Sequence, residues 1–345
     1  MTLVVIDADV LGRQRTGDET YVRNLLRTLP EPAAAAGLRL LAVTRRPELV
    51  PAGVEAVEFR VRSQELRMAW TLPRLLRRLG ADLVHTQYAI PLRTPCRAVV
   101  TIHDVSFEDP ALMARRDRLV FRTIVPRSAR AAARVLTVSE RSKRDLVARY
   151  GLAPEKVVVT PNGVDPVFRA ATVAGAASNS LLRAPYVLVV GAIQARKNQR
   201  AALAAAREAG LELVVVGPTK DEAVADELRR GGARLEGYVS LERLAELYRG
   251  AACLVQPSLH EGFGLPVVEA MASGTPVVAL PDPAVVEVAG DAAVVVEECA
   301  LADGIRTALA DRERLVAAGL ARAATFSWEE TAEATVRVYR EALAR

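Results

Sequence analysis

Short apolar runs alternate with longer amphipathic segments along this 345-residue chain. The runs are rich in Val, Ile and Leu, which is typical of buried strands. Segments such as 20–29 and 66–79 instead place apolar residues at helical spacing, with arginines on the opposite face. This alternation predicts parallel sheets wound with helices. The predicted strands are 3–6, 38–43, 83–85, 98–103, 135–138 and 157–159, and then 186–191, 212–216, 253–256 and 276–279.

A break between the two series of strands divides the chain. Residues 170–180 are small, uncharged and without periodicity, and we interpret residues 170–184 as a linker. The expected domains are residues 1–169 and 185–325, followed by a final helical segment at 326–345. The fold class that this pattern predicts is α/β, with two Rossmann-like, doubly wound parallel-sheet domains facing a cleft. Ligands would bind there, at the carboxyl ends of the strands.

Several standard site signatures are absent from the sequence. No glycine precedes a lysine, so the chain has no Walker P-loop. No G-x-G-x-x-G follows a strand, which disfavours a nicotinamide or flavin dehydrogenase. The pair Asp7-Ala8-Asp9 could suggest a divalent metal, but it directly follows the first strand, where turn and capping chemistry is the better interpretation. We therefore expect no metal site.

Basic residues gather in the first half of the chain. Residues 1–170 hold 28 Lys and Arg against 18 Asp and Glu, whereas residues 171–345 hold 18 against 23. This asymmetry predicts that the first domain meets something anionic, such as phosphates or a membrane surface. Aromatic residues are only 4% of the chain, which disfavours nucleic acid as a partner. Two arginine-rich amphipathic stretches, 60–78 and 115–134, could lie on anionic lipid or pack their apolar faces on the domain's own sheet.

The location of the protein is suggested by three absences. The sequence has no run of about 18 uncharged apolar residues, and its first residues lack a basic segment. Its three cysteines are widely separated, which is not the pattern of a disulfide framework. We expect a cytoplasmic protein, with peripheral contact at the inner membrane face as an option.

The densest set of chemically suggestive residues lies at 258–279, which reads as a loop, a helix and a strand. Glu261 and Glu269 stand eight residues apart and bracket the sequence Gly-Phe-Gly-Leu-Pro. Gly262 and Gly264 let the backbone approach a ligand closely, and the N–H groups at the start of the helix attract anions. A carboxylate at Glu269 could accept hydrogen bonds from both hydroxyls of a vicinal diol. The segment therefore predicts a site for a phosphorylated, hydroxylated ligand.

Three further pairs of residues follow predicted strands. Arg196 and Lys197 are suited to phosphate oxygens, as a planar fork and a point charge. His103 and Asp104 end the strand at 98–103, which would place them at the edge of the cleft, with Asp104 as a candidate for the acceptor side. Gly17 opens a helix after the first strand and can offer a backbone N–H to a diphosphate, while the neighbouring Asp18 would repel that group and suits an acceptor better.

The segment 258–279 resembles the Glu-x7-Glu motif of retaining glycosyltransferases of family 4, which have the two-Rossmann GT-B architecture. Other matches cover nearly the whole chain in the family's order. They are 137–142, 160–165, the strand and loop at 190–198, and 326–328 at the start of a final helix that crosses back to the first domain in this fold. Asp18 departs from the commonest family pattern, which has a glycine or an apolar residue there.

This resemblance implies transfer of a sugar, with retention of anomeric configuration, from a UDP- or GDP-linked donor to a hydroxyl of a glycan, glycolipid or natural product. By the same analogy Glu269 binds the ribose hydroxyls, Glu261 a hydroxyl of the donor sugar, and Arg196 and Lys197 the diphosphate. His103 matches a position near the donor sugar and would bond a sugar hydroxyl or help to orient the acceptor as a catalytic residue. The backbone of Phe263, Gly264 and Leu265 would lie against sugar and phosphate, and Val239 against the base.

The mechanism that we favour is front-face attack by the acceptor hydroxyl, because the sequence offers no convincing enzyme nucleophile. Arg196 and Lys197 would neutralise the leaving diphosphate, so neither a metal nor another cofactor is expected. Three alternatives stay open. They are a GT-B epimerase that uses water, a phosphorylase that needs pyridoxal phosphate, and a nucleotide-sugar-binding subunit without activity.

Overall fold

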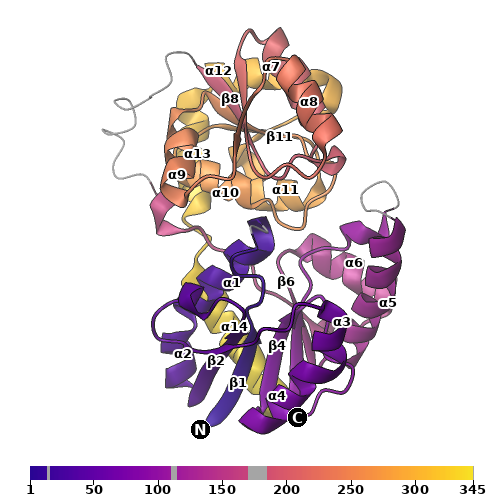
Figure 1. Ribbon diagram of the computed structural model, residues 1–345. Helices are drawn as coiled ribbons and strands as arrows, with labels where there is room; N and C mark the ends of the chain where they lie inside the picture. Colours follow the sequence, from indigo (N-terminus) through magenta and orange to yellow (C-terminus); the bar gives the residue numbers. More distant parts are fainter. Residues whose placement is uncertain (14–15, 110–114, 170–184, 345) are drawn as a thin grey trace. The chain divides into compact units, whose positions relative to one another are not determined.

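The computed structural model describes residues 1–13, 16–109, 115–169 and 185–344 (Figure 1). The chain forms two compact units, unit 1 with Met1–Gly163 and Trp328–Arg345, and unit 2 with Val164–Ser327. The linker expected at 170–184 lies outside the described residues. Residues 164–169, which we assigned to the first domain, instead pack with unit 2. There the Ser273 hydroxyl donates to the carbonyl of Phe168 (3.1 Å) and Arg249 donates to that of Val167 (2.6 Å).

The described strands of unit 1 form a seven-stranded parallel sheet in the order β3-β2-β1-β4-β5-β6-β7. β1 pairs with β2 from Thr2 opposite Leu38, and with β4 from Val4 opposite Leu83. The strands are β1 (Thr2–Asp7), β2 (Leu38–Thr44), β3 (Glu55–Glu58), β4 (Leu83–Gln87), β5 (Arg97–Thr101), β6 (Arg134–Thr137) and β7 (Val157–Val159).

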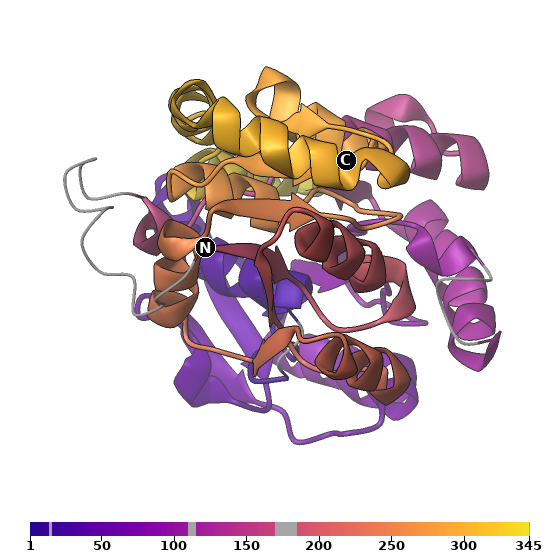
Figure 2. The ribbon, with the colours of Figure 1, turned by 90° about the horizontal axis from the view of Figure 1, so that it is seen from above.

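Helices cover both faces of this sheet (Figure 1 and Figure 2). On one face α1 (Thr16–Thr28), α2 (Pro30–Ala35) and the C-terminal α14 (Trp328–Ala344) contact one another. On the other face the core joins the strands to the η2 turn (Arg67–Thr71), α4 (Leu72–Leu79), α5 (Arg115–Ala131) and α6 (Glu140–Tyr150). The η2 turn is π-helical and continues from the short α3 (Gln64–Leu66). The second basic stretch thus packs part of its apolar face on the sheet, through residues such as Val125 and Ala129.

A buried chain of polar side chains fixes α14 to the sheet. The two ring nitrogens of His85 on β4 hydrogen-bond to the hydroxyls of Tyr339 and Thr101, each at 2.7 Å. The Thr101 hydroxyl also bonds that of Tyr21 on α1 at 3.1 Å. Burial lowers the pKa of His85 to about 3. The C-terminal helix is therefore held through a neutral imidazole.

Unit 2 repeats the same architecture on a smaller scale. Its described strands form a six-stranded parallel sheet in the order β10-β9-β8-β11-β12-β13. They are β8 (Tyr186–Val190), β9 (Glu212–Val216), β10 (Arg234–Gly237), β11 (Cys253–Gln256), β12 (Val277–Ala279) and β13 (Val294–Val295). One core joins these strands to α7 (Gln199–Glu208), α8 (Glu222–Arg230) and α12 (Leu301–Ala310). The remaining helices are α9 (Leu241–Gly250), α10 (Leu265–Ala272), α11 (Pro283–Ala289) and α13 (Arg312–Ala323), and α10 contacts the other three.

The expected fold class is confirmed, with two Rossmann-like parallel-sheet units. The sequence pattern missed the strands β3, β10 and β13. All three are at a sheet edge, where one side of the strand has no neighbour and a continuous apolar run is not required. β3 reads Glu-Ala-Val-Glu and β10 reads Arg-Leu-Glu-Gly, so neither has the composition of a central strand.

The buried imidazole of His85 predicts a loss of stability in acid. Because its pKa falls from about 6.5 unfolded to about 3 folded, the unfolded chain binds more protons between these values. The contribution of His85 to the free energy of unfolding is complete above pH 6.5. Below that pH it should fall by about 1.4 kcal/mol per pH unit. In urea unfolding at pH 7, 6, 5 and 4.5, His85→Gln should show a shallower dependence on pH by about this amount. Parallel curves for the two proteins would contradict the assignment.

Candidate functional site

The first candidate site lies in unit 2, where the order of the strands reverses. The strands β8 and β11 are neighbours in the sheet although three helices separate them in sequence, and the loops after them diverge at their carboxyl ends. The first loop contains the short η7 turn (Ala195–Lys197) and the second leads into α10. Arg196 joins the two loops, since its guanidinium donates to the carbonyl of His260 at 2.7 Å and its own carbonyl accepts from Leu259 at 3.1 Å.

A buried ion pair forms the centre of this site. The ammonium of Lys197 lies 2.5 Å from Oε1 of Glu261, and the guanidinium of Arg196 lies 3.8 Å from Oε2. Burial by itself would raise the pKa of Glu261, but the charges of Lys197 and Arg196 outweigh it and hold that pKa below its usual value. Gly191 has a φ of +148°, and a Cβ there would be 3.4 Å from the Lys197 Cε, so the glycine lets the lysine stem lie against the backbone.

Two residues that the sequence did not suggest hold Glu261 in position. The side-chain amide of Gln256, at the end of β11, donates to Oε1 of Glu261 at 2.7 Å. Asp282 accepts the backbone N–H of Glu261 at 3.2 Å and also caps α11 by accepting from Ala284 and Val285. No local motif marks either residue. Gln256 is five residues from Glu261 and Asp282 is 21 residues away, and both contacts depend on how the loop after β11 folds.

Glu269 lies in α10 and is buried, with 7% of its surface exposed. The hydroxyl of Tyr248 on α9 donates to its Oε2 at 2.8 Å, a second contact that the sequence did not suggest. Both burial and the neighbouring carboxylate raise the pKa of Tyr248, so this hydroxyl stays protonated. Gly264 precedes α10 with a φ of +95°, a conformation that favours glycine, and it directs the chain into the helix.

The other predicted donor-side residues lie around these two carboxylates or close to a strand end. Phe263 packs its ring edge-to-face on Phe326 (5.5 Å), and its side chain is buried. Gly262 is buried beside Glu261, and Leu265 is half-buried in the first turn of α10. Val239 is half-buried, two residues after β10.

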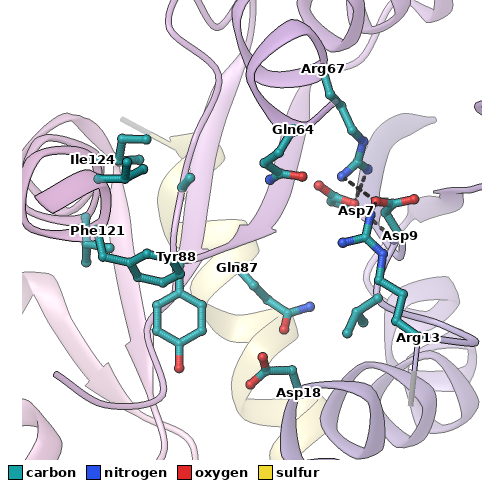
Figure 3. A pocket seen from close by; sticks show the side chains of 14 residues that line it. Asp7, Asp9, Arg13, Asp18, Gln64, Arg67, Gln87, Tyr88, Phe121 and Ile124 are labelled. Carbon is teal, nitrogen blue, oxygen red and sulfur yellow. Dashed lines mark hydrogen bonds and ion pairs between the residues drawn. The ribbon is translucent and has the colours of Figure 1, made fainter. Parts of the chain in front are cut away.

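The second candidate site is a cavity of about 240 Å³ in unit 1 (Figure 3). It lies at the corresponding reversal of strand order, between β1 and β4. One side is polar, and the other is apolar, with Tyr88, Phe121 and Ile124 (Figure 3). Tyr88 has a φ of +58°, which is uncommon for a bulky residue and is typical of functional loops. The polar lining residues are Asp7, Asp9, Arg13, Asp18, Gln64, Arg67 and Gln87.

The Asp7–Asp9 pair is more than a turn. The Asp9 N–H does donate to Oδ1 of Asp7 (3.1 Å), as turn chemistry predicts. However, Arg67 from the η2 turn pairs with both carboxylates, and only 2% of its side chain is exposed. Asp9 also pairs with Arg13 and with Arg45, the latter at 2.8 Å. The sequence pattern placed Arg67 on the basic face of a predicted helix. Its burial was not predicted because its partners are about 60 residues away.

His103 lies close to Asp18 in unit 1, and the neighbouring Asp104 is held in a local turn. His103 Nε2 lies 3.9 Å from Asp18 and 3.4 Å from Oε1 of Gln87. Burial lowers the pKa of His103 despite the opposing charges of Asp18 and Asp104, so the ring is neutral near pH 7. Asp104 accepts from the N–H and hydroxyl of Ser106 at 2.9 and 2.8 Å, a local turn. Gly17 is exposed in the first turn of α1, and a Cβ there would meet open space.

No group of three or more His, Cys, Asp or Glu in the part of the chain that the structure describes is arranged to hold a metal ion. None of the helices within the described ranges has the length and apolar character needed to cross a membrane.

Both units match families of glycosyltransferases. Residues 15–168 match the family described as Glycosyltransferase Family 4, and residues 176–322 match Glycosyl transferases group 1. The O-antigen chain mannosyltransferase B of Escherichia coli is 31% identical over 88% of this chain and 83% of its own length. A D-inositol 3-phosphate glycosyltransferase of Xylanimonas cellulosilytica is 31% identical over 76% of this chain and 73% of its own.

A solved structure supports the fold. Anabaena HepE, crystallised with UDP and glucose, superposes with a TM-score of 0.74 at 16% identity, over 99% of this chain and all of that one.

The buried pair of Lys197 and Glu261 predicts strong coupling in stability. Lys197→Met should lower the free energy of unfolding by about 3 kcal/mol, because the buried carboxylate loses the ammonium that compensates it. Adding Glu261→Gln should recover most of this loss, as measured by urea denaturation. Arg229→Met, which removes an exposed pair with Asp226, is the control and should change little. Additive costs for the two site substitutions would show that they are not coupled.

Proposed function

The chain belongs to the glycosyltransferases of the family 4 and group 1 class, and on that premise we propose that it moves a sugar from a UDP- or GDP-linked donor to an acceptor hydroxyl of a glycan, glycolipid or natural product. The observation that carries the donor half of this proposal is the group of Arg196, Lys197 and Glu261 in unit 2. These side chains are brought together at the reversal of strand order, where sheets of this type bind ligands.

The diphosphate is the leaving group, and Arg196 and Lys197 are suited to hold it. Breaking the bond between the sugar and phosphate adds negative charge to a phosphate oxygen, and fixed cations stabilise that charge in a site with little water. An ammonium has three donors, so Lys197 can keep its contact with Glu261 and bind a phosphate oxygen as well. The start of α10, after Gly262 and Gly264, adds backbone N–H groups.

The two carboxylates of the Glu-x7-Glu spacing have different surroundings, which supports different tasks for them. Glu261 is balanced by two cations and would bind a hydroxyl of the donor sugar. Glu269 is held by Tyr248 and would bind the ribose hydroxyls. The backbone of Phe263, Gly264 and Leu265 would contact sugar and phosphate, and Val239 the base.

The proposed reaction proceeds on one face of the sugar. The acceptor oxygen forms its bond to the anomeric carbon on the face that the diphosphate leaves, and a phosphate oxygen of the leaving group takes the hydroxyl proton. Configuration is then retained without a covalent enzyme intermediate. The two cations of unit 2 balance the charge of the leaving group, so the proposal requires neither metal nor another cofactor.

Unit 1 would bind the acceptor through its cavity. Asp18 and Gln87 line that cavity with hydrogen-bond acceptors and donors, beside an apolar wall. His103 is neutral and close to both, so it can bond a hydroxyl and orient it. Asp104 is engaged by Ser106 and is the weakest of the candidates for the acceptor side.

Peripheral contact with an anionic membrane is part of the same proposal, with a cytoplasmic location. Several apolar side chains of the basic stretches are exposed, among them Leu66 (57%), Trp70 (57%) and Leu119 (70%). The guanidinium of Arg74 lies 4.6 Å from the ring centre of Trp70. Apolar and basic side chains in this combination suit a lipid surface with negative charge, and flotation with vesicles measures such a contact.

A GT-B epimerase that uses water is the nearest alternative. It shares the fold and the donor, but an enzyme of that kind does not need a second substrate, whereas a transferase does. A pyridoxal phosphate-dependent phosphorylase needs a lysine for its cofactor, and a chain with four lysines gives it little support. A binding subunit without activity has less support, since Arg196, Lys197, Glu261 and Glu269 are all present.

Binding of a nucleoside diphosphate tests the donor half of the proposal. One of UDP, GDP, ADP and dTDP, at 100 times its dissociation constant, should stabilise the wild type by about 2.7 kcal/mol in thermal unfolding. Glu269→Ala should lose this effect because the ribose contact is gone, while the exposed Glu222→Ala on α8 should keep it. The donor assignment fails if no nucleotide stabilises the folded wild type.

The stereochemistry of the product tests the mechanism. With the nucleotide sugar so identified and a panel of glycan and lipid-linked acceptors, nuclear magnetic resonance of the first product should show the anomeric configuration of the donor. Adding EDTA should leave the rate of transfer unchanged, because Arg196 and Lys197 supply the positive charge. An inverted product, or activity that returns only with a divalent metal, would contradict front-face transfer.

A further inference from the structure

A second cavity in unit 1 is lined almost entirely by arginine. It has a volume of about 480 Å³ and lies where three neighbouring parallel strands end, since its residues come from the segments after β1, β2 and β3. Among the residues that the structure describes, no carboxylate lines it. The lining residues are Leu11, Gly12, Arg13, Arg45, Arg46, Arg60 and Arg62.

Buried Asp9 holds two of these arginines from behind. Arg45 donates through its Nε to Oδ1 of Asp9 at 2.8 Å, and Arg13 pairs with Oδ2. The Asp9 side chain is 3% exposed, and its carboxylate does not line this second cavity. A guanidinium has five N–H donors, so Arg45 has further donors beyond the Nε–H that contacts Asp9. Asp9 thus holds both guanidinium groups at the cavity, Arg45 through Nε and Arg13 through a terminal nitrogen.

The remaining arginines leave an excess of positive charge at the rim of the cavity. Arg46 and Arg60 pair with Glu48 and Glu58, and all four side chains are well exposed, so these pairs are weak and readily exchanged. Arg62 has no ion-pair partner within the described ranges. The five arginines of the lining thus face three paired carboxylates, Asp9, Glu48 and Glu58. A further acid, Glu19, accepts the N–H of Gly12.

This arginine pocket adjoins the acceptor cavity, because Arg13 lines both. From this geometry we propose that the arginine pocket binds a phosphate group carried by the acceptor, whose sugar hydroxyls occupy the adjoining cavity. The proposal rests on the proposed function and deepens it, since it names the acceptor as a phosphorylated or phospholipid-linked glycan. Guanidinium forks match phosphate oxygens in pairs, and several of them together can balance a dianion.

The excess of basic residues in the first half of the chain has a local explanation in this pocket. The loops after β2 and β3 place arginines two at a time, Arg45 with Arg46 and Arg60 with Arg62, at the same edge of the sheet. Arg77 and Arg78 on α4 are equally basic and exposed, but they are not part of the pocket. They offer a control of the same charge.

The test compares Arg60→Gln/Arg62→Gln with Arg77→Gln/Arg78→Gln. Both pairs are exposed, so neither should disturb folding, and each removes two charges. Both are built in full-length protein that carries Lys197→Met and Glu261→Gln, so that the unit 2 site does not compete. Glycerol 3-phosphate and uncharged glycerol are titrated by calorimetry. Glycerol 3-phosphate should bind and glycerol should not, with affinity reduced at least tenfold by the first pair and less than twofold by the second.

The source of the phosphate is resolved with vesicles. Flotation with phosphatidylglycerol and with phosphatidylcholine vesicles is compared for the same variants. Binding to the anionic vesicles that depends on Arg60 and Arg62, without binding of glycerol 3-phosphate, identifies a lipid headgroup as the source. Equal weakening by both pairs, or no binding of either probe, overturns the proposal.

The nucleotide experiment on the wild type separates this proposal from the proposed function. If a nucleoside diphosphate stabilises the protein but phosphate binding does not depend on Arg60 and Arg62, only the phosphorylated acceptor is refuted. If phosphate binds as expected and no nucleotide does, the pocket stands and the donor assignment fails.

Discussion

The reversal of strand order in each parallel sheet is the constraint on which both sites depend. Right-handed crossovers place successive helices on one face while the sheet grows in one direction, and on the other face after it turns back. The loops that leave the two strands at the reversal therefore diverge. In unit 2 these strands are β8 and β11, and in unit 1 they are β1 and β4. Lys197 and Glu261 follow the first pair, and Asp9 and Gln87 lie at the ends of the second.

Buried charge follows from this geometry. Each reversal contains a carboxylate that is almost fully buried, Glu261 in unit 2 and Asp9 in unit 1, and each is compensated by cations from elements distant in sequence. Removing two charges from water costs several kcal/mol per ion, so such pairs contribute little net stability. Their effect is orientation. A carboxylate that is paired with Lys197 or Arg67 keeps one rotamer. A site made of side chains held in this way needs little reorganisation when a ligand binds.

The sequence predicted the features that depend on neighbouring residues. Central strands were recognised because both of their faces are buried and their runs are apolar, and Arg196, Lys197, Glu261 and Glu269 stood out because each lies in a distinctive loop or helix start. The edge strand β3 was not predicted, since a half-exposed Glu-Ala-Val-Glu has no such run. The roles of Tyr248 and Arg67 were not predicted either. Their roles come from contacts with Glu269 and Asp7 that tertiary folding creates, and nothing local distinguishes them from other helical residues.

The cations of the unit 2 site and the arginines of the arginine pocket in unit 1 differ in burial. This difference determines which task each set can perform. Lys197 and Glu261 have side chains about one-tenth exposed, where water and salt screen charge poorly, so small changes of charge on a bound group are strongly felt. That is the environment needed to stabilise charge as a bond breaks. Arg60 and Arg62 are exposed and are screened, and they can attract a permanent anion without responding to chemistry. A fixed phosphate suits the second set, and a leaving diphosphate suits the first.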